Sequence, residues 1–498
     1  MEVGEVGKPK RTLSVTDAIA VVVGIVIGAG IFATPAMVAK QAPSGTAYIL
    51  LWVAGGLVSL VGALCYAELA TTYPDAGGEY HFLRRGLGSG AGFLFAWARL
   101  TVIQTGSIAI HAFIIGDYAA DLVKARGWVG EAGGQAALLS SVIAVLTVVA
   151  LTGLNLVGVR QGKTTQKLLS GCVLTAVLLV CVGGFLAAPA EAAAAPAAAA
   201  SGAAASDGPG SFWWIGAAMV FVLLTYGGWN EAAYLSAEVR GERRGIVKVL
   251  LGGIALVTVV YLLINFAYLR GLGLSGIAGS DAVAADMLRR GRLGDAGATF
   301  VTLIIVVAAL GNMNATIMTG ARTSYALGRD FPMFAPLGRW RRGREAPVTA
   351  LLVQGVMTLA LVIFCSLQRN GLEAMVKYTT PVFWLFLLLT GISLIVLRVK
   401  DSGAERPFRV PLFPVTPILF CLVCGYMLHS GIMFAGPTNA LLGLGVLALG
   451  VPLMLIARRT VRGSQGADDA QRGFDPVLLG GPGKTAPAGG GGGGTDHT

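Results

Sequence analysis

Two glycine-containing interruptions of apolar segments hold backbone groups that are well placed to bind a solute. Gly28-Ala29-Gly30 lies within the apolar run 22–40, and Pro35 follows within two turns. Gly227-Gly228 lies within a second apolar run. Glycine and proline are poor helix formers, so helices broken at these points leave backbone amides and carbonyls that need other partners. We expect both breaks to contact a solute; the alternative is that small residues only allow close helix packing.

The polarity of the freed groups suits a zwitterion. Amides at residues 28–31 begin the outer half of the first helix, at the positive end of a helix dipole, and favour a carboxylate. Carbonyls ending the inner half of that helix, and those near the second break, favour an ammonium group. An amino acid carries both groups, so the sequence predicts an amino acid site. The predicted substrate-binding residues are Val26, Ile27, Gly28, Ala29, Gly30, Ile31, Thr225, Tyr226, Gly227 and Gly228.

Charged and polar side chains inside apolar segments are costly and often functional. Glu231 follows the second break, either as a coupling or substrate-sensing group or as a carboxylate that stabilises the dipole of the inner half-helix. Arg99 and Glu68 approach the same side of the membrane, where an ion pair competes with the simpler interpretation that each extends separately to water. The gating or coupling candidates are Trp229, Asn230, Glu231, Asn314, Thr316 and Thr319. Gln104, Thr105, Ser107, Thr316 and Thr319 are polar enough to line a cavity, and the alternative for each is a helix-capping or interhelical hydrogen bond. His111 and His429 are interpreted as ordinary interior residues.

Composition places the chain among multi-spanning membrane proteins. The 498 residues are 55% hydrophobic and 13% charged, against roughly a quarter charged in a soluble globule. The net charge of +11 comes from basic residues in short loops, which argues against a nucleic-acid partner. The six cysteines lie in apolar segments without the spacing of a disulfide framework or a metal site, and no cofactor is expected. No convergent catalytic set indicates an enzyme, and no repeated polar rings indicate a channel.

Hydropathy predicts an all-α integral membrane protein with twelve transmembrane helices. The segments lie near 15–40, 46–72, 91–120, 136–157, 164–188, 211–236, 246–270, 297–324, 347–366, 375–398, 412–432 and 438–457. Most of the 37 Lys and Arg residues fall on one side, which predicts cytoplasmic N- and C-termini. The loop 187–210 is an Ala- and Pro-rich low-complexity connection, and 461–498 is predicted to be a disordered cytoplasmic tail.

The domain organisation follows from the two breaks, which lie five segments apart and in opposite directions. Broken helices at matching positions of opposed halves indicate an inverted-repeat transporter with a site at the midplane. We predict a cytoplasmic tail over 1–13, a ten-helix transport core over 14–400, and helices 11 and 12 over 401–460. Within the core, repeat 1 covers about 14–188 and repeat 2 about 211–400.

Several motifs, in order, resemble the amino acid–polyamine–organocation transporter family, in its L-type amino acid transporter-like bacterial branch. The resemblance covers about residues 14–460. Its motifs are GIVIGAGIF at 24–32, Tyr66-Ala67-Glu68-Leu69, Gly77-Gly78-Glu79-Tyr80, Tyr226-Gly227-Gly228-Trp229-Asn230-Glu231, Arg329-Asp330 and Arg406-Pro407-Phe408-Arg409-Val410-Pro411, with Asn314 and Arg322 matching the eighth-helix pattern. The resemblance implies a LeuT-type 5+5 inverted repeat plus two additional C-terminal helices, moving amino acids by alternating access.

Three departures from the family pattern leave specificity and coupling open. Ala29 replaces a frequent serine, and Leu224 replaces an aromatic lid, for which Trp229 or Tyr226 is a possible substitute. Val173 stands near the position where relatives often carry a lysine that relays protons or takes the place of sodium. Lysine-based proton coupling is therefore not expected. The resemblance is to a branch that commonly works as sodium-independent exchangers, which implies exchange or proton-linked uptake ahead of sodium symport.

The functional expectation is a secondary active transporter of amino acids, small or neutral, in the cytoplasmic membrane. The alternatives are a transporter of cationic amino acids or polyamines and a non-transporting amino acid sensor of the same fold. The external loop near 121–135 has no cysteine, so no disulfide-linked heavy chain is expected. The expected partners are the amino acid and the lipid bilayer, with a homodimer as a further possibility.

Overall fold

The computed structural model describes residues 19, 23–24, 26–75, 77–127, 134–157, 163–186, 213–231, 245–291, 293–339, 347–368 and 370–472. These residues form a helical bundle, and the described part of the chain contains no strand. The predicted loop 187–210 and residues 473–498 of the predicted tail lie outside the described residues, as do parts of the first and sixth predicted spans. The all-helical class predicted from the sequence is confirmed.

Eight helical segments of the described chain are long and apolar enough to cross a membrane. They are α3 (Gly45–Thr72), the continuous α5–η1–α6 (Ser89–Ala98, Arg99–Ile103, Gln104–Ala125), α7 (Gln135–Val157), α11 (Gly245–Ala278), α13 (Gly294–Asp330), α14 (Val348–Ser366), α15 (Gly371–Lys400) and α16 (Val415–Arg472). The outer faces of these helices are apolar: Leu138 and Leu146 on α7, for example, are 66% and 60% exposed. A wet surface of this kind is unfavourable, so these faces meet lipid.

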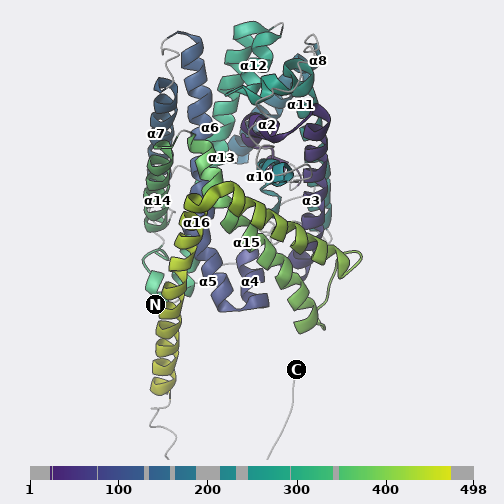
Figure 1. Ribbon diagram of the computed structural model, residues 1–498. Coiled ribbons are helices and arrows are strands. Elements are labelled where there is room, and N and C mark those ends of the chain that lie inside the picture. The colour runs from purple at the N-terminus through teal and green to yellow at the C-terminus, as the bar shows by residue number, and fades with distance from the viewer. Residues whose placement is uncertain are drawn as a thin grey trace, which may run out of the picture.

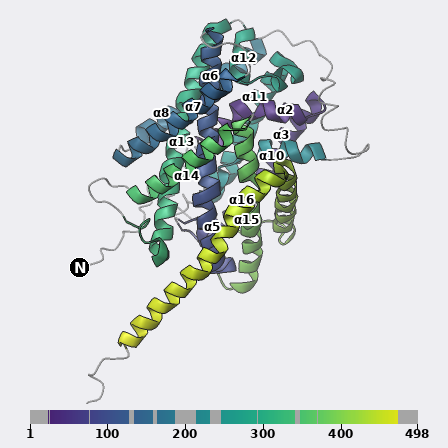
Figure 2. The same cartoon turned by 60° about the vertical axis from the view of Figure 1, so that its left-hand side comes forward.

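The remaining helices lie between or across these eight segments; most are shorter, although the helix over Lys163–Leu186 has 24 residues. They are α2 (Gly30–Gln41), α4 (Glu79–Leu87), α8 (Lys163–Leu186), α10 (Trp213–Tyr226), α12 (Val283–Arg290) and the 3₁₀ turn η3 (Pro332–Phe334). Helices α2 and α10 pack against each other in the body of the bundle. Helices α12 and α4 lie at opposite ends of it (Figures 1 and 2).

Local sequence explains where several helices begin and end. The Ser44 side chain accepts a hydrogen bond from the Ala47 amide and caps α3, and Asn370 caps α15 in the same way. Gly228 has a φ of 100°, a conformation that favours glycine, directly after the end of α10. Gly436, with a φ of 70°, divides α16 into two limbs that correspond to the eleventh and twelfth predicted spans. The second limb runs to Arg472 (Figure 2), so residues 461–472 are helical where the sequence predicted a disordered tail.

Ion pairs fasten the end of the bundle that carries α4. Glu68, 1% exposed, accepts hydrogen bonds from the Arg398 guanidinium and from the Val410 amide, and Arg406 lies 3.5 Å away. The predicted alternatives for Glu68, an ion pair with Arg99 or separate extension to water, are therefore both wrong. Apolar spacing placed the two residues at one side of the membrane, but helix rotation turns Glu68 toward α15 and the segment before α16 instead.

Candidate functional site

The first break separates a short helical stretch from α2. The Gly28 amide donates to the Val26 carbonyl at 2.8 Å, and α2 begins at Gly30 with no side-chain cap. The first amides of a helix have no intrahelical acceptor, so those of Gly30 and Ile31 are available to an anion. The amide of Gly28, predicted to be available as well, is already bonded.

The two breaks meet through α2 and α10. The Thr34 hydroxyl on α2 lies 2.5 Å from the Thr225 hydroxyl on α10, and it also lies 3.0 Å from the Gly30 carbonyl. A Cβ built on Gly30 would lie 3.8 Å from the Thr225 backbone. The breaks predicted from sequence to form one site are thus in contact, although they are almost two hundred residues apart in the chain.

A tyrosine on α11 lies within hydrogen-bond distance of a backbone carbonyl at each of the two breaks. The Tyr261 hydroxyl lies 2.7 Å from the Val26 carbonyl and 3.0 Å from the Thr225 carbonyl, and Tyr261 is fully buried. These are two of the carbonyls predicted to receive a substrate amine, and in the structure they share the single proton of this hydroxyl. The ring of Tyr261 packs against Tyr226 and Trp52. Sequence reasoning missed Tyr261 because nothing near it marks a site.

A cavity of about 280 Å³ opens beside the breaks. Val26, Gly28, Gly30, Thr225, Gly227 and Gly228 contribute to its wall, so six of the ten predicted substrate-binding residues line it. The other four, Ile27, Ala29, Ile31 and Tyr226, are buried in the surrounding core. That these lining residues bind a substrate remains a prediction.

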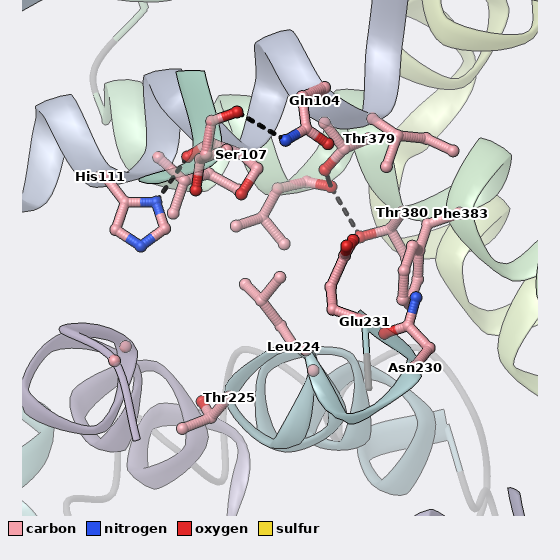
Figure 3. Close-up of a pocket in the computed structure, with 18 of the residues that line it drawn as sticks. Gln104, Ser107, His111, Leu224, Thr225, Asn230, Glu231, Thr379, Thr380 and Phe383 are labelled. Carbon is pink, nitrogen blue, oxygen red and sulfur yellow. Dashed lines mark hydrogen bonds between the residues drawn. The ribbon is translucent and has the colours of Figure 1, made fainter. Parts of the chain in front are cut away.

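Helices α6, α13 and α15 form the wall that faces α10. Figure 3 shows Leu224 projecting from α10 toward Gln104 and Ser107 of α6, with Phe383 of α15 to one side. Gln104 donates to the Thr316 carbonyl on α13 at 2.8 Å, which fixes its amide at the cavity wall. Hydroxyl and amide groups thus alternate with apolar groups on this side, an arrangement typical of small-molecule sites.

Several sequence-predicted residues have places other than those expected. Trp229 packs on Tyr66, and Tyr226 packs in the core, so the substitutes proposed for an aromatic lid do not line the cavity. Thr105 is also buried outside the lining, and Asn314 accepts a hydrogen bond from Asn155. Residues that do line the cavity are Gln104, Ser107, Thr316, Thr319, Asn230 and Glu231, together with His111, whose ring bonds the Ser107 carbonyl. The aromatic residues of the lining are Phe95, Phe383, Trp384 and Phe386, none of which the sequence singled out.

A charged cluster lies at one part of this wall. The Arg99 guanidinium donates to both carboxylate oxygens of Glu231, at 2.8 and 3.0 Å, and lies 3.8 Å from Glu79. The Arg99 side chain is only 3% exposed, so the predicted extension to water is wrong. Arg99 belongs to η1, a π-helical turn, and such turns occur often at functional sites. Arg99, Glu231 and Glu79 are charged residues in or between apolar segments, so each of them needs a partner. The sequence could not say which partner each one has.

Glu79 on α4 is the most buried carboxyl of the cluster. It accepts hydrogen bonds from the Tyr66 hydroxyl and from the Asn230 amide. Burial raises the pKa of Glu79 above its ordinary value, and the nearby Arg99 opposes this rise. Glu79 appeared in the sequence only within a family motif, and only the fold places it against the residues that follow the second break.

The chain is similar to a described protein family and to several known proteins. A family model described as "Amino acid permease" matches residues 13–451. The chain is 28% identical over 424 residues to the b(0,+)-type amino acid transporter 1 of Mus musculus, covering 85% of this chain and 83% of that protein. The same coverage and identity are found with the Homo sapiens protein of that name. The large neutral amino acids transporter small subunit 2 of Mus musculus is 26% identical over 447 residues, covering 90% and 81%.

Proposed function

Because this chain belongs to the amino acid permease family, we propose that it is a secondary active transporter that moves amino acids across the cytoplasmic membrane by alternating access. The observation that carries this proposal is the meeting of two broken helices at one cavity. Amides at the start of α2 border that cavity, and a helix start of this kind favours a carboxylate. The proteins similar to this chain are named as amino acid transporters, so transport of amino acids agrees with both lines of support.

We place the α-carboxylate of the substrate at the amide of Gly30, which begins α2 and lines the cavity. The α-ammonium group then lies toward the Thr225 carbonyl, which accepts from Tyr261 and has a second lone pair that can accept a hydrogen bond. The substrate side chain extends toward Leu224, Phe383 and the polar groups of α6 and α13. This orientation uses the backbone for the groups that all amino acids share and the far wall for selectivity.

The proposed architecture has twelve transmembrane helices, as a LeuT-type 5+5 inverted repeat plus two additional C-terminal helices. The division into a core over 14–400 and helices 11 and 12 over 401–460 follows this proposal, with both termini cytoplasmic. The interrupted helices at α2 and α10 support it, since opposed halves of this kind place their breaks at the same site.

We propose small or neutral L-amino acids as substrates, with exchange or proton linkage as the driving process. Supporting this, the cavity wall is mainly apolar and hydroxyl-bearing, and its arginine is paired with Glu231. The runner-up is a transporter of cationic amino acids or polyamines, which Glu79 and Glu231 at the cavity favour. We expect the chain to act without a disulfide-linked heavy chain, alone or as a homodimer.

The proposal is tested by reconstituting the full chain in liposomes. Uptake of a labelled panel of neutral, cationic and acidic amino acids is measured with and without internal amino acid, a pH gradient or a sodium gradient. Saturable uptake of a neutral amino acid, stimulated by internal amino acid or by an inward proton gradient, is expected. Absence of uptake under every condition, by protein that remains monodisperse and binds amino acids, would instead identify a sensor.

A further inference from the structure

We infer that Arg99 is a specificity-determining residue: by pairing with Glu231 inside the cavity, it excludes substrates that carry a cationic side chain. This inference rests on the proposed amino acid transport and names the feature that restricts its substrates. The contact joins η1, which lies between α5 and α6, to the segment that follows the second break. The sequence gave no indication of this contact.

The pair is asymmetric in its exposure to the cavity. Arg99 and Glu231 both line it, but the arginine side chain is 3% exposed and the glutamate side chain is 28% exposed. The carboxylate therefore faces the space that a substrate enters, while the guanidinium reaches it from behind. Figure 3 shows Glu231 beside Thr380 and Phe383, on the side of the cavity where the substrate side chain is proposed to lie.

An arginine is suited to occupy such a carboxylate permanently. Its guanidinium does not lose its proton in proteins, and its planar donors match carboxylate oxygens. The donor bonds at 2.8 and 3.0 Å use both oxygens of Glu231. Glu79, 3.8 Å from the same guanidinium, holds the arginine in place from the other side.

A lysine or ornithine side chain needs a carboxylate partner, and Arg99 already occupies the carboxylate of Glu231. Its ammonium group would approach a carboxylate that is neutralised, and it would meet the like charge of the guanidinium. Neutral side chains meet neither effect. Removing the guanidinium while keeping an apolar stem leaves Glu231 in the cavity as an unneutralised carboxylate, and a cationic side chain then supplies the missing charge.

The test compares three versions of the full chain: wild type, Arg99→Met and the double variant Arg99→Met/Glu231→Gln. Purified protein binds the labelled neutral amino acid that wild type takes up fastest, and unlabelled lysine or unlabelled neutral amino acid competes. In Arg99→Met, the ratio of the lysine to the neutral inhibition constant is expected to fall by at least about tenfold, the equivalent of about 1.4 kcal/mol. In the double variant the ratio returns to within about threefold of the wild-type value. The exposed carboxylate at position 231 is gone, and Glu79 is only 6% exposed and keeps its hydrogen bonds from Tyr66 and Asn230.

An unchanged ratio in Arg99→Met would overturn the inference. A lower ratio that persists in the double variant would overturn it as well. Folding is checked by thermal unfolding and gel filtration, and Arg99→Gln, which keeps donors for Glu231, replaces Arg99→Met if the latter is unfolded. Folded variants that bind no amino acid would also overturn it, because Arg99 would then be required for binding itself.

The inference and the proposed function fail in different ways. Wild-type protein that transports no amino acid contradicts the proposed function. Wild-type protein that transports neutral amino acids, with Arg99 variants that show no gain for lysine, contradicts only the role of Arg99. Strong competition by lysine in the wild type would contradict the inference directly and favour the cationic alternative.

Discussion

Removing the Tyr261 hydroxyl should destabilise the backbone conformation at both helix breaks. The hydroxyl lies within hydrogen-bond distance of the Val26 and Thr225 carbonyls, at 2.7 and 3.0 Å, and has one proton to donate. Tyr261→Phe deletes a single oxygen and keeps the ring packed against Tyr226 and Trp52. The change therefore isolates the hydrogen bonds from the packing.

The size of the effect follows from what remains bonded. A buried carbonyl left without a partner costs about 1–3 kcal/mol. The Val26 carbonyl keeps its bond from the Gly28 amide, so the loss is expected at the lower end, about 1–2 kcal/mol. If the whole of this free energy is lost from substrate binding, because the breaks are less ordered, the substrate affinity falls by about fivefold to thirtyfold.

The assay is amino acid binding and thermal unfolding of purified protein, with transport measured in parallel. Tyr426→Phe serves as the matched control, because Tyr426 is 44% exposed and is not among the residues that line the cavity. Weaker binding in Tyr261→Phe, with little change in the control, is expected. Equal affinity in wild type and Tyr261→Phe would show that neither carbonyl depends on this hydroxyl, which would refute the reasoning.

The remaining predictions concern the first break and the ion pairs outside it. A Cβ on Gly30 meets Thr225 at 3.8 Å, an ordinary contact, so Gly30→Ala should bind amino acids nearly normally while Gly30→Leu abolishes binding; similar affinities in a binding assay would contradict this. Glu68→Ala leaves the guanidinium groups of Arg398 and Arg406, whose side chains are 17% and 6% exposed, without their carboxylate. It should lower the free energy of unfolding by about 3 kcal/mol, checked by thermal and denaturant unfolding. The pKa of Asp401 lies below its ordinary value because Arg85 and then Tyr73 donate to it. Its stabilisation is therefore present above the ordinary value and lost as pH falls through the lower, folded-state pKa, so wild type should be more stable than Asp401→Asn at neutral pH and equal to it in strong acid.

The position of the two breaks was readable because low helix propensity is a local property. Glycine at positions 28, 30, 227 and 228 lowers helix propensity, and the structure places all four beside the cavity. Gly55-Gly56 lies inside the continuous helix α3, so a glycine pair does not by itself decide a break. The apolar segments were equally readable, since nine of them fall in the eight long apolar helices of the described residues, with α16 covering two. The wall of the cavity that faces α10 was less readable from the sequence. Thr379, Thr380 and Phe383 look like ordinary residues of an apolar helix and acquire a role only by facing the cavity.

Charge pairing marks the boundary between the two sources of information. The sequence by itself determined that Arg99, Glu68 and Glu231 stand in or beside apolar segments and therefore need partners, because an unpaired charge is costly there. Only the tertiary structure decided that Arg99 takes Glu231 and Glu79 while Glu68 takes Arg398 and Arg406. The physical reason is that hydropathy fixes the depth of a residue along a helix, whereas the partner depends on the rotation of that helix and on its neighbours, which packing of the whole bundle sets.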